Sequence, residues 1–148
     1  MSNYLTREEL IGIYGEPIST YGILQSIEDG YHVNANQGDF KSVTNDLCPS
    51  TIDNRMVVAM TREVYELIEK AVDNPKWHND YAGVWWDIGF MGGVNRCGTR
   101  LRNDQLKWYG MKTIITGTGR KRLYRFKFTL EGVSEHDNRI ALIVSLVK

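Results

Sequence analysis

The most apolar stretch of the chain, DYAGVWWDIGFMGGVNR, covers residues 80–96 and places apolar side chains on nearly every side of a predicted helix. A helix that is hydrophobic all round is normally buried. We therefore expect it to lie at the centre of the fold, with other elements covering Trp85, Trp86, Ile88, Phe90 and Met91. Each glycine in the stretch costs a helix about 1 kcal/mol relative to alanine. This cost indicates a close contact or a bend at Gly83, Gly89, Gly92 and Gly93.

Helical spacing marks three segments before this stretch. Residues 6–13 begin with a capping box, in which Thr6 and Glu9 satisfy free backbone amides. A second helix is expected from Ser19 or Thr20 up to Gly30, because glycine tolerates the left-handed conformation of a helix end. The third helix covers residues 61–74, with a threonine cap and apolar positions at i, i+3 and i+4 spacing. The proline after it disfavours helical geometry in the residue that precedes it.

The last third of the chain changes to alternating apolar and polar positions. Residues 112–116 predict a strand and residues 117–119 a turn, after which a run to Leu130 buries one face and leaves the other largely basic. We interpret residues 131–138 as a polar connection. Residues 139–147 are apolar on both faces, as in a strand that is central or covered by helices. A short strand is also expected at residues 31–35, and a buried strand or extended segment at residues 56–60.

These elements predict an α+β fold in which residues 1–148 form a single domain. Its C-terminal antiparallel sheet should have the helices packed on one face, around the buried Trp-rich helix. Residues 97–99 should close that helix, and residues 100–108 form a short helix or an irregular arm. Residues 34–54 are polar and lack a period, and structureless loops of this length are usually functional or disordered. We interpret them as a variable surface loop or as a place where a partner docks.

The charge balance narrows the class of partner. The chain has 18 basic and 18 acidic side chains, whereas a dedicated nucleic-acid binder usually has a basic excess.

The N-terminal sequence lacks the features of a signal peptide, and the longest apolar run, residues 140–144, is far shorter than a membrane span. We therefore expect a soluble, cytoplasmic protein that does not associate with membranes.

No motif of known catalytic mechanism occurs in the chain. Cys48 and Cys97 are too few for a disulfide framework and lack metal-ligand spacing. Asp87 lies in the most apolar stretch, where a carboxylate has to be hydrogen-bonded, paired or on an edge, and we interpret it as structural. The histidines are scattered at polar or boundary positions, namely His32, His78 and His136. We predict a protein that is not an enzyme, with no catalytic residue, metal or cofactor.

The only dense basic cluster lies around the predicted turn and the strand after it. On a strand, Lys121, Arg125 and Lys127 point the same way. Such a strip is able to hold phosphates or an acidic protein surface, although a solvated sheet face has the same pattern. Neighbouring aromatic residues favour an interface, because aromatic side chains and arginine are enriched at hot spots. The candidate binding residues are Lys112, Arg120, Lys121, Arg125, Lys127, Trp108 and Tyr109. An exposed pair of Trp108 and Tyr109 would also suit a homodimer contact.

Several stretches together resemble a domain family of unknown function that is encoded by phages, plasmids and bacterial genomes. They are IYGEPIS at residues 13–19, IEDG at 27–30, VVAMTREVY at 57–65 and WWDIGFM at 85–91, followed by the C-terminal pair of strands. The resemblance implies a shared fold and a mobile-element accessory gene. It also implies binding of a host or defence component, because small phage proteins of this kind often act in this way. It implies no catalytic residues.

Three functional hypotheses follow. The first is a non-enzymatic phage or mobile-element protein that binds and modulates a host or defence protein in the host cell cytoplasm. The second is a nucleic-acid-binding module that uses the strip of Lys121, Arg125 and Lys127. The third is a small-molecule-binding protein or enzyme with a pocket between the sheet and the helix of Trp85 and Trp86.

Overall fold

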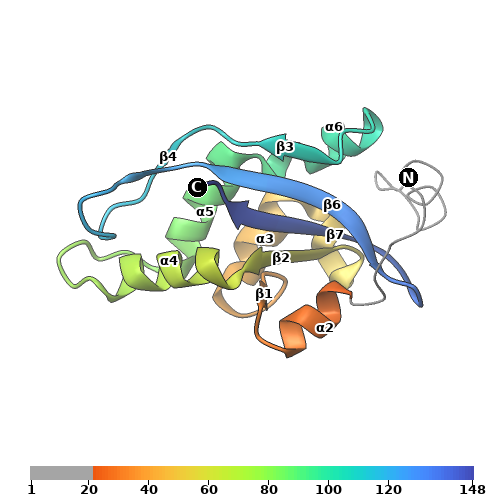
Figure 1. Cartoon of the computed structure of the whole chain (residues 1–148), viewed down its shortest axis with the longest axis horizontal. Helices are drawn as coiled ribbons and strands as arrows, with labels where there is room; N and C mark the ends of the chain where they lie inside the picture. Colours follow the sequence, from red (N-terminus) through yellow and green to blue (C-terminus); the bar gives the residue numbers. More distant parts are fainter. Residues whose placement is uncertain (1–21) are drawn as a thin grey trace.

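The computed structural model describes residues 22–148, so the predicted helix at residues 6–13 and the predicted helix start at Ser19 or Thr20 lie outside the described residues. The first elements are α2 (Ile23–Glu28), β1 (His32–Asn34), the 3-10 helix η1 (Gly38–Phe40), α3 (Lys41–Leu47), η2 (Pro49–Asn54), β2 (Val57–Thr61) and α4 (Arg62–Asp73). They are followed by α5 (Tyr81–Gly92), η3 (Val94–Arg96), α6 (Cys97–Arg102), β3 (Lys107–Tyr109), β4 (Thr113–Ile114), β5 (Leu123–Tyr124), β6 (Phe126–Ser134) and β7 (Asp137–Leu146). Figure 1 shows β6 and β7 side by side along the middle of the molecule.

A five-stranded sheet in the order β1-β2-β7-β6-β3 forms the framework, and β4 and β5 pair in a separate small sheet. The central strand β7 pairs antiparallel with β6 and parallel with β2. The predicted α+β class is confirmed. The C-terminal antiparallel strands are extended by the parallel pairing with β2, which the sequence pattern did not predict. The strands expected at residues 31–35 and 56–60 are present as β1 and β2.

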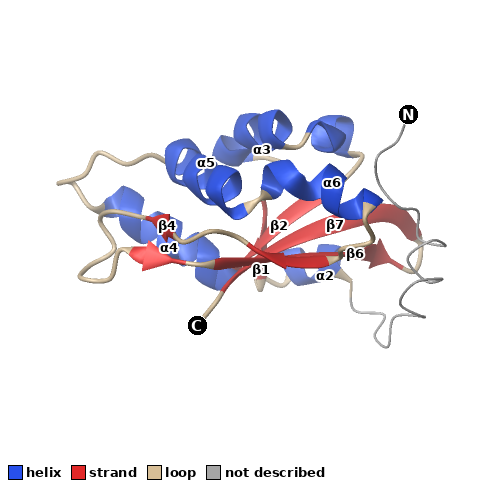
Figure 2. Cartoon of the chain, turned by 90° about the horizontal axis from the view of Figure 1, so that it is seen from above, coloured by secondary structure: helices blue, strands red, loops and turns tan. Residues whose placement is uncertain are grey.

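Helices cover the two faces of the sheet unequally. α3, α4 and α5 pack on one face, where Val64, Trp85 and Phe128 belong to one large core cluster. Figure 2 shows α3, α5 and α6 as a layer on one side of the sheet. On the opposite, outer face, Ile23 of α2 packs with Val57 in a small second core. α2 is therefore the exception to the predicted packing of helices on one face, and it covers only part of the outer face.

Two helix ends agree with their sequence signals. The helix predicted at residues 61–74 is confirmed as α4, and Thr61 Oγ1 accepts a 3.3 Å hydrogen bond from the Val64 amide at its start. Gly30, expected at the end of α2, has a φ of 85°. This conformation favours glycine over residues that carry a Cβ.

α5 begins and ends in the expected manner for a capped helix. The Asp80 carboxylate accepts a 2.6 Å hydrogen bond from the Gly83 amide at the N-terminus, and Gly93 ends the helix with a φ of 114°. A close contact is present at Gly89, where an added Cβ would lie 2.5 Å from Leu47 Cδ1 of α3. The predicted closure of this helix at residues 97–99 is wrong, because these residues begin α6.

The side chains of α5 are covered on one side only. Trp85 and Ile88 are fully buried, as predicted. The predicted burial of Trp86, Phe90 and Met91 is wrong, because they are 40%, 50% and 36% exposed. α5 lies in the helix layer that covers the main core, so the sheet and α3 cover one side of it and the other side faces solvent.

The segment at residues 34–54 is not the structureless loop that its composition predicted, because it contains η1, α3 and η2. Phe40, Val43 and Leu47 recur at helical spacing among its polar residues and are buried in the main core. Thr44 of α3 is also buried and accepts a 2.9 Å hydrogen bond from the indole Nε1 of Trp85. The segment therefore builds part of the helix layer.

The predicted polar connection at residues 131–138 is also wrong. β6 continues to Ser134 and β7 begins at Asp137, so a tight hairpin joins the two strands. The pairing register shifts between Gly132 and Ser134. The Asp137 carboxylate lies 2.6 Å from Nη2 of Arg139. This hydrogen-bonded guanidinium holds the pKa of Asp137 below its usual value.

Candidate binding surface

Alternate residues of β3 and β6 form the exposed part of the outer sheet face. Tyr109 faces Lys127 across the two strands, and Lys107 faces Thr129. Phe128, which lies between the two β6 residues, is fully buried on the core side. Successive side chains of a strand point to opposite faces. Lys107, Tyr109 and Lys127 therefore share the outer face.

Arg125 joins this group from the position before β6. Its guanidinium lies 5.3 Å from the centre of the Tyr109 ring, and its Nε donates a 3.1 Å hydrogen bond to the Gly110 carbonyl oxygen. These contacts hold the cation against an aromatic ring that is itself 45% exposed. A fixed pair of arginine and aromatic side chain loses little freedom on binding, and such residues are enriched at interface hot spots.

An apolar pair continues the surface beyond Arg125. Ile114 of β4 faces Leu123 of β5, and the two side chains are 62% and 50% exposed. Leu123 and Arg125 flank Tyr124, whose ring is buried, so the alternation turns both of them toward solvent. We define the β3–β6 face by its members Lys107, Tyr109, Ile114, Leu123, Arg125 and Lys127.

The structure brings together only some of the candidate residues named from the sequence. The Nζ atom of Lys121 lies 5.3 Å from the ring centre of Tyr124. Lys121 therefore contacts Tyr124, whose ring is buried, whereas Arg125 contacts the exposed Tyr109. The other two candidate cations, Lys112 and Arg120, are exposed in the segments that precede β4 and β5. The candidates that lie on the β3–β6 face are Tyr109, Arg125 and Lys127.

Trp108 is buried and does not contribute to this surface. It is 4% exposed and stacks on Phe128 with ring centres 5.7 Å apart. Its indole Nε1 is buried without a hydrogen-bond partner among residues 22–148. Trp108 is buried because side chains alternate along β3, and Lys107 and Tyr109 take the outward positions. The expected exposure of Trp108 is wrong, and the homodimer hypothesis is left with Tyr109 alone.

Sequence reasoning missed Lys107. The signal was the alternation of lysine, tryptophan and tyrosine at residues 107–109, which is a short strand pattern. The interpretation of residues 100–108 as a helix or irregular arm concealed it. Only the pairing of β3 with β6 places Lys107 beside the other cations.

The remaining candidates for chemistry lie apart from each other. Asp87 is exposed on α5, which is one of the placements expected for it, and partial desolvation raises the pKa of its carboxyl group. Within residues 22–148, no three side chains of His, Cys, Asp or Glu are placed to hold a metal ion. In the same part of the chain, no helix has the length and apolar character needed to cross a membrane.

Core side chains occupy the space between the sheet and α5, where the third hypothesis places a pocket. Trp85, Phe126 and Phe128 are all fully buried there. Phe40 of η1 packs edge-on to Trp85 with ring centres 5.9 Å apart. A pocket opens instead beside the edge strand β1.

No family model, no curated protein and no solved structure matches the chain. The resemblance to a phage and plasmid family therefore stays a prediction. The function has to be inferred from the residues of the surface themselves.

Proposed function

We propose that this chain is a non-enzymatic binding protein of a phage or other mobile element, which docks an acidic surface of a host or defence protein on its β3–β6 face. One observation carries the proposal. The Arg125 guanidinium is held over the exposed Tyr109 ring, and Lys127 lies directly across the strands from that ring.

The charges of the β3–β6 face support an acidic partner. Its charged members Lys107, Arg125 and Lys127 are basic, and the acidic Glu131 lies beyond Thr129 at the far end of the same outward row of β6. The two salt bridges between side chains of residues 22–148 join other residues, so these cations are available to carboxylates of a partner. Complementary charges across an interface speed association and select the partner.

The apolar members of the face favour a protein over a nucleic acid. Ile114 and Leu123 are exposed as a pair beside the cations. A protein partner buries such side chains with a gain of roughly 25 cal/mol per Å² of apolar area. Phosphates gain nothing from them, and the chain as a whole has a formal charge of zero.

The nucleic-acid hypothesis has one observation in its favour, which is the exposed Tyr109 ring beside Arg125 and Lys127. Aromatic side chains in a basic groove are platforms on which bases of a single strand stack. An experiment on this surface therefore has to distinguish the two classes of partner.

Site-specific photo-cross-linking makes this distinction. The photoreactive amino acid p-benzoylphenylalanine replaces Leu123, and the protein is irradiated in lysate of the bacterium that harbours the gene. We expect a discrete adduct that mass spectrometry identifies as a protein and that keeps its gel mobility after nuclease treatment. An adduct that nuclease removes supports the nucleic-acid hypothesis instead.

The matched control has the same photoreactive residue in place of Ile52 on η2. Ile52 is 41% exposed and lies outside the β3–β6 face. The proposal predicts that this variant does not give the adduct. It is contradicted if both positions give the same adduct, or if the variant at position 123 gives none.

A further inference from the structure

The sheet ends at β1, and none of the strands among residues 22–148 pairs with its outer edge. Val33 of β1 faces Met60 of β2, and the Ala35 amide donates a 2.7 Å hydrogen bond to β2. Bonds between antiparallel strands alternate along each strand, so the backbone groups of His32 and Asn34 turn away from β2. An edge of this kind is a template for pairing with another chain.

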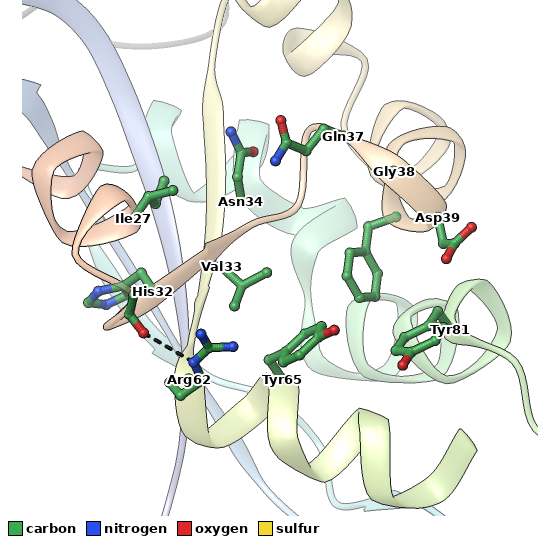
Figure 3. Close-up of a pocket in the computed structure, with 12 residues that line it drawn as sticks. Ile27, His32, Val33, Asn34, Gln37, Gly38, Asp39, Arg62, Tyr65 and Tyr81 are labelled. Atoms are coloured by element: carbon green, nitrogen blue, oxygen red, sulfur yellow. Dashed lines mark hydrogen bonds between the residues drawn. The ribbon is translucent and has the colours of Figure 1, made fainter. Parts of the chain in front are cut away.

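A pocket of about 560 Å³ opens beside this edge, between β1, η1 and the first turns of α4 and α5 (Figure 3). One wall is aromatic. Tyr65 and Tyr81 stack with ring centres 6.2 Å apart, and Phe40 packs edge-on to both rings. The amide side chains of Asn34 and Gln37 line the pocket on the other side. Such a lining offers apolar contact and a few polar groups that orient a ligand.

Arg62 supplies the positive charge of this pocket. Its Nε donates a 3.1 Å hydrogen bond to the Gly30 carbonyl oxygen, which is the dashed line in Figure 3. Its guanidinium carbon lies 5.5 Å from the centre of the Tyr65 ring. The side chain is therefore held in place with its terminal nitrogens toward the pocket (Figure 3). A guanidinium forms its strongest hydrogen bonds with carboxylates and phosphates.

A second pocket, of about 440 Å³, continues the first one. The two share Asn34, Gln37 and Gly38, and the second adds the exposed Lys41. We call these two neighbouring pockets, which share residues of β1 and of the segment after it, the β1 groove. It has Arg62 in one part and Lys41 in the other.

The charges that line the β1 groove are mainly basic. Arg139 lines the second pocket but is paired with Asp137. Arg62 and Lys41 therefore outnumber Asp39, which lines the first pocket. The groove offers backbone groups to a strand and cations to its side chains.

We infer that the β1 groove binds an extended peptide segment with acidic side chains, which adds to the sheet as a strand beside β1. Backbone hydrogen bonds to His32 and Asn34 supply affinity, and pockets for alternate side chains supply specificity. Acidic side chains of the peptide pair with Arg62 and Lys41. The site is separate from the β3–β6 face, because β1 and β3 are the opposite ends of the sheet.

An NMR titration with defined peptides tests this inference. The probes are two pools of blocked heptapeptides with glutamate in one pool and lysine in the other at the third and fifth positions. The remaining positions contain a mixture of Val, Ile, Thr and Tyr. We expect the glutamate pool to cause saturable shifts of the His32 and Asn34 amides, and the lysine pool to bind at least about tenfold more weakly. The absence of saturable shifts up to about 1 mM of the glutamate pool, or shifts confined to other residues, overturns the inference.

A first pair of variants tests the backbone contact. Asn34→Pro removes an outward amide, and proline is tolerated on an edge strand where its missing N–H faces solvent. Asn34→Ala is the matched control, because it also loses the side chain that accepts a 2.7 Å hydrogen bond from the Asn36 amide. We expect Asn34→Pro to bind the glutamate pool about tenfold more weakly than Asn34→Ala. Equal affinities overturn strand addition at β1.

A second pair of variants tests whether the positive charge of Arg62 selects the acidic peptides. This pair still tests binding in the β1 groove if Asn34→Pro does not fold. Arg62→Glu reverses the cation of the groove. Lys70→Glu makes the same charge change on the same helix, outside both pockets. Arg62→Glu should reverse the preference between the two pools, and Lys70→Glu should keep it. The same response from both variants contradicts a site at Arg62.

Discussion

The indole Nε1 of Trp85 donates a 2.9 Å hydrogen bond to Thr44 Oγ1, although 41 residues separate them in the chain. Both side chains are fully buried. The same hydroxyl donates a 2.7 Å hydrogen bond to the Ala35 carbonyl oxygen. Thr44 therefore links α3 by hydrogen bonds to α5 and to Ala35, the residue that follows β1.

Replacement of Thr44 by valine tests how much these two hydrogen bonds contribute to the stability of the fold. Thr44→Val keeps the shape of the side chain but leaves Trp85 Nε1 and the Ala35 carbonyl without their partner. A buried polar group left unpaired costs about 1–3 kcal/mol. We expect a loss of this size in the free energy of unfolding, measured by urea denaturation. Thr44→Ser keeps the hydroxyl and is the control, and equal losses for the two variants would argue against the hydrogen bonds as the cause.

The neighbouring residues Trp85 and Trp86 should differ strongly in their contribution to stability. Trp85 is fully buried, whereas Trp86 is on the solvent side of α5 and stacks on Phe90 with ring centres 5.7 Å apart. Truncation of a buried tryptophan costs about 3–5 kcal/mol, and surface substitutions cost much less. Urea denaturation of Trp85→Ala and Trp86→Ala measures both effects. Similar losses for the two variants would show that the exposed side of α5 is covered after all.

The fold was predictable where one periodicity covers a whole element. The cap at Thr61 predicted the start of α4 correctly, and the alternation up to Leu130 predicted β6 but not its end at Ser134. α5 was less predictable, because a helix with apolar residues on every side does not reveal which side the fold covers. α3 was missed because its buried residues stand among polar ones, as with Val43 and Leu47.

His32 should make stability depend on pH. Burial lowers the pKa of His32 from the usual 6.5, so the folded protein favours the neutral ring, whose Nδ1 lies 2.5 Å from Ser26 Oγ. As the pH falls below 6.5, the unfolded chain takes up the proton first and the folded state loses stability. Above that pH both states are neutral and this contribution does not change.

The measurement for His32 is the urea midpoint at about pH 7.5 and about pH 5. We expect the decline on acidification to be larger for the wild type than for His32→Gln. Asp137 does not contribute to the pH dependence in this range. Its pKa is lowered in the folded state, so its contribution to the stability of the folded state is lost only as the pH falls below the usual 3.8. Equal declines in the two proteins would mean that His32 titrates with the same pKa in both states.

Cys48 and Cys97 should be unreactive in the folded protein. Both are buried, and the neighbouring Cys48 thiol, together with burial, raises the pKa of Cys97. The neighbouring Cys97 thiol lowers the pKa of Cys48, but burial keeps reagents away from it. We expect Ellman's reagent to react slowly with native protein and rapidly with both thiols in urea. A rapid phase of one thiol per chain in the native state would contradict the burial of one of them.

The candidate surface was predictable in part. Arg125 and Lys127 were identified from alternation along one strand, which is local information. Lys107 and the burial of Trp108 depend on the pairing of β3 with β6, a contact between segments distant in sequence. No local pattern contains that information. The β1 groove was not predicted at all, because its walls come from β1, η1, α4 and α5.

The yield of the photo-cross-linked adduct after charge reversal tests the proposed function most directly. Lys127→Glu is introduced into the variant with p-benzoylphenylalanine at position 123, and Arg102→Glu, on an exposed residue of α6, is the control. If the β3–β6 face docks an acidic protein surface, Lys127→Glu lowers the yield about tenfold and Arg102→Glu leaves it unchanged. An unchanged yield with Lys127→Glu, or an equal loss with both variants, contradicts docking through this face.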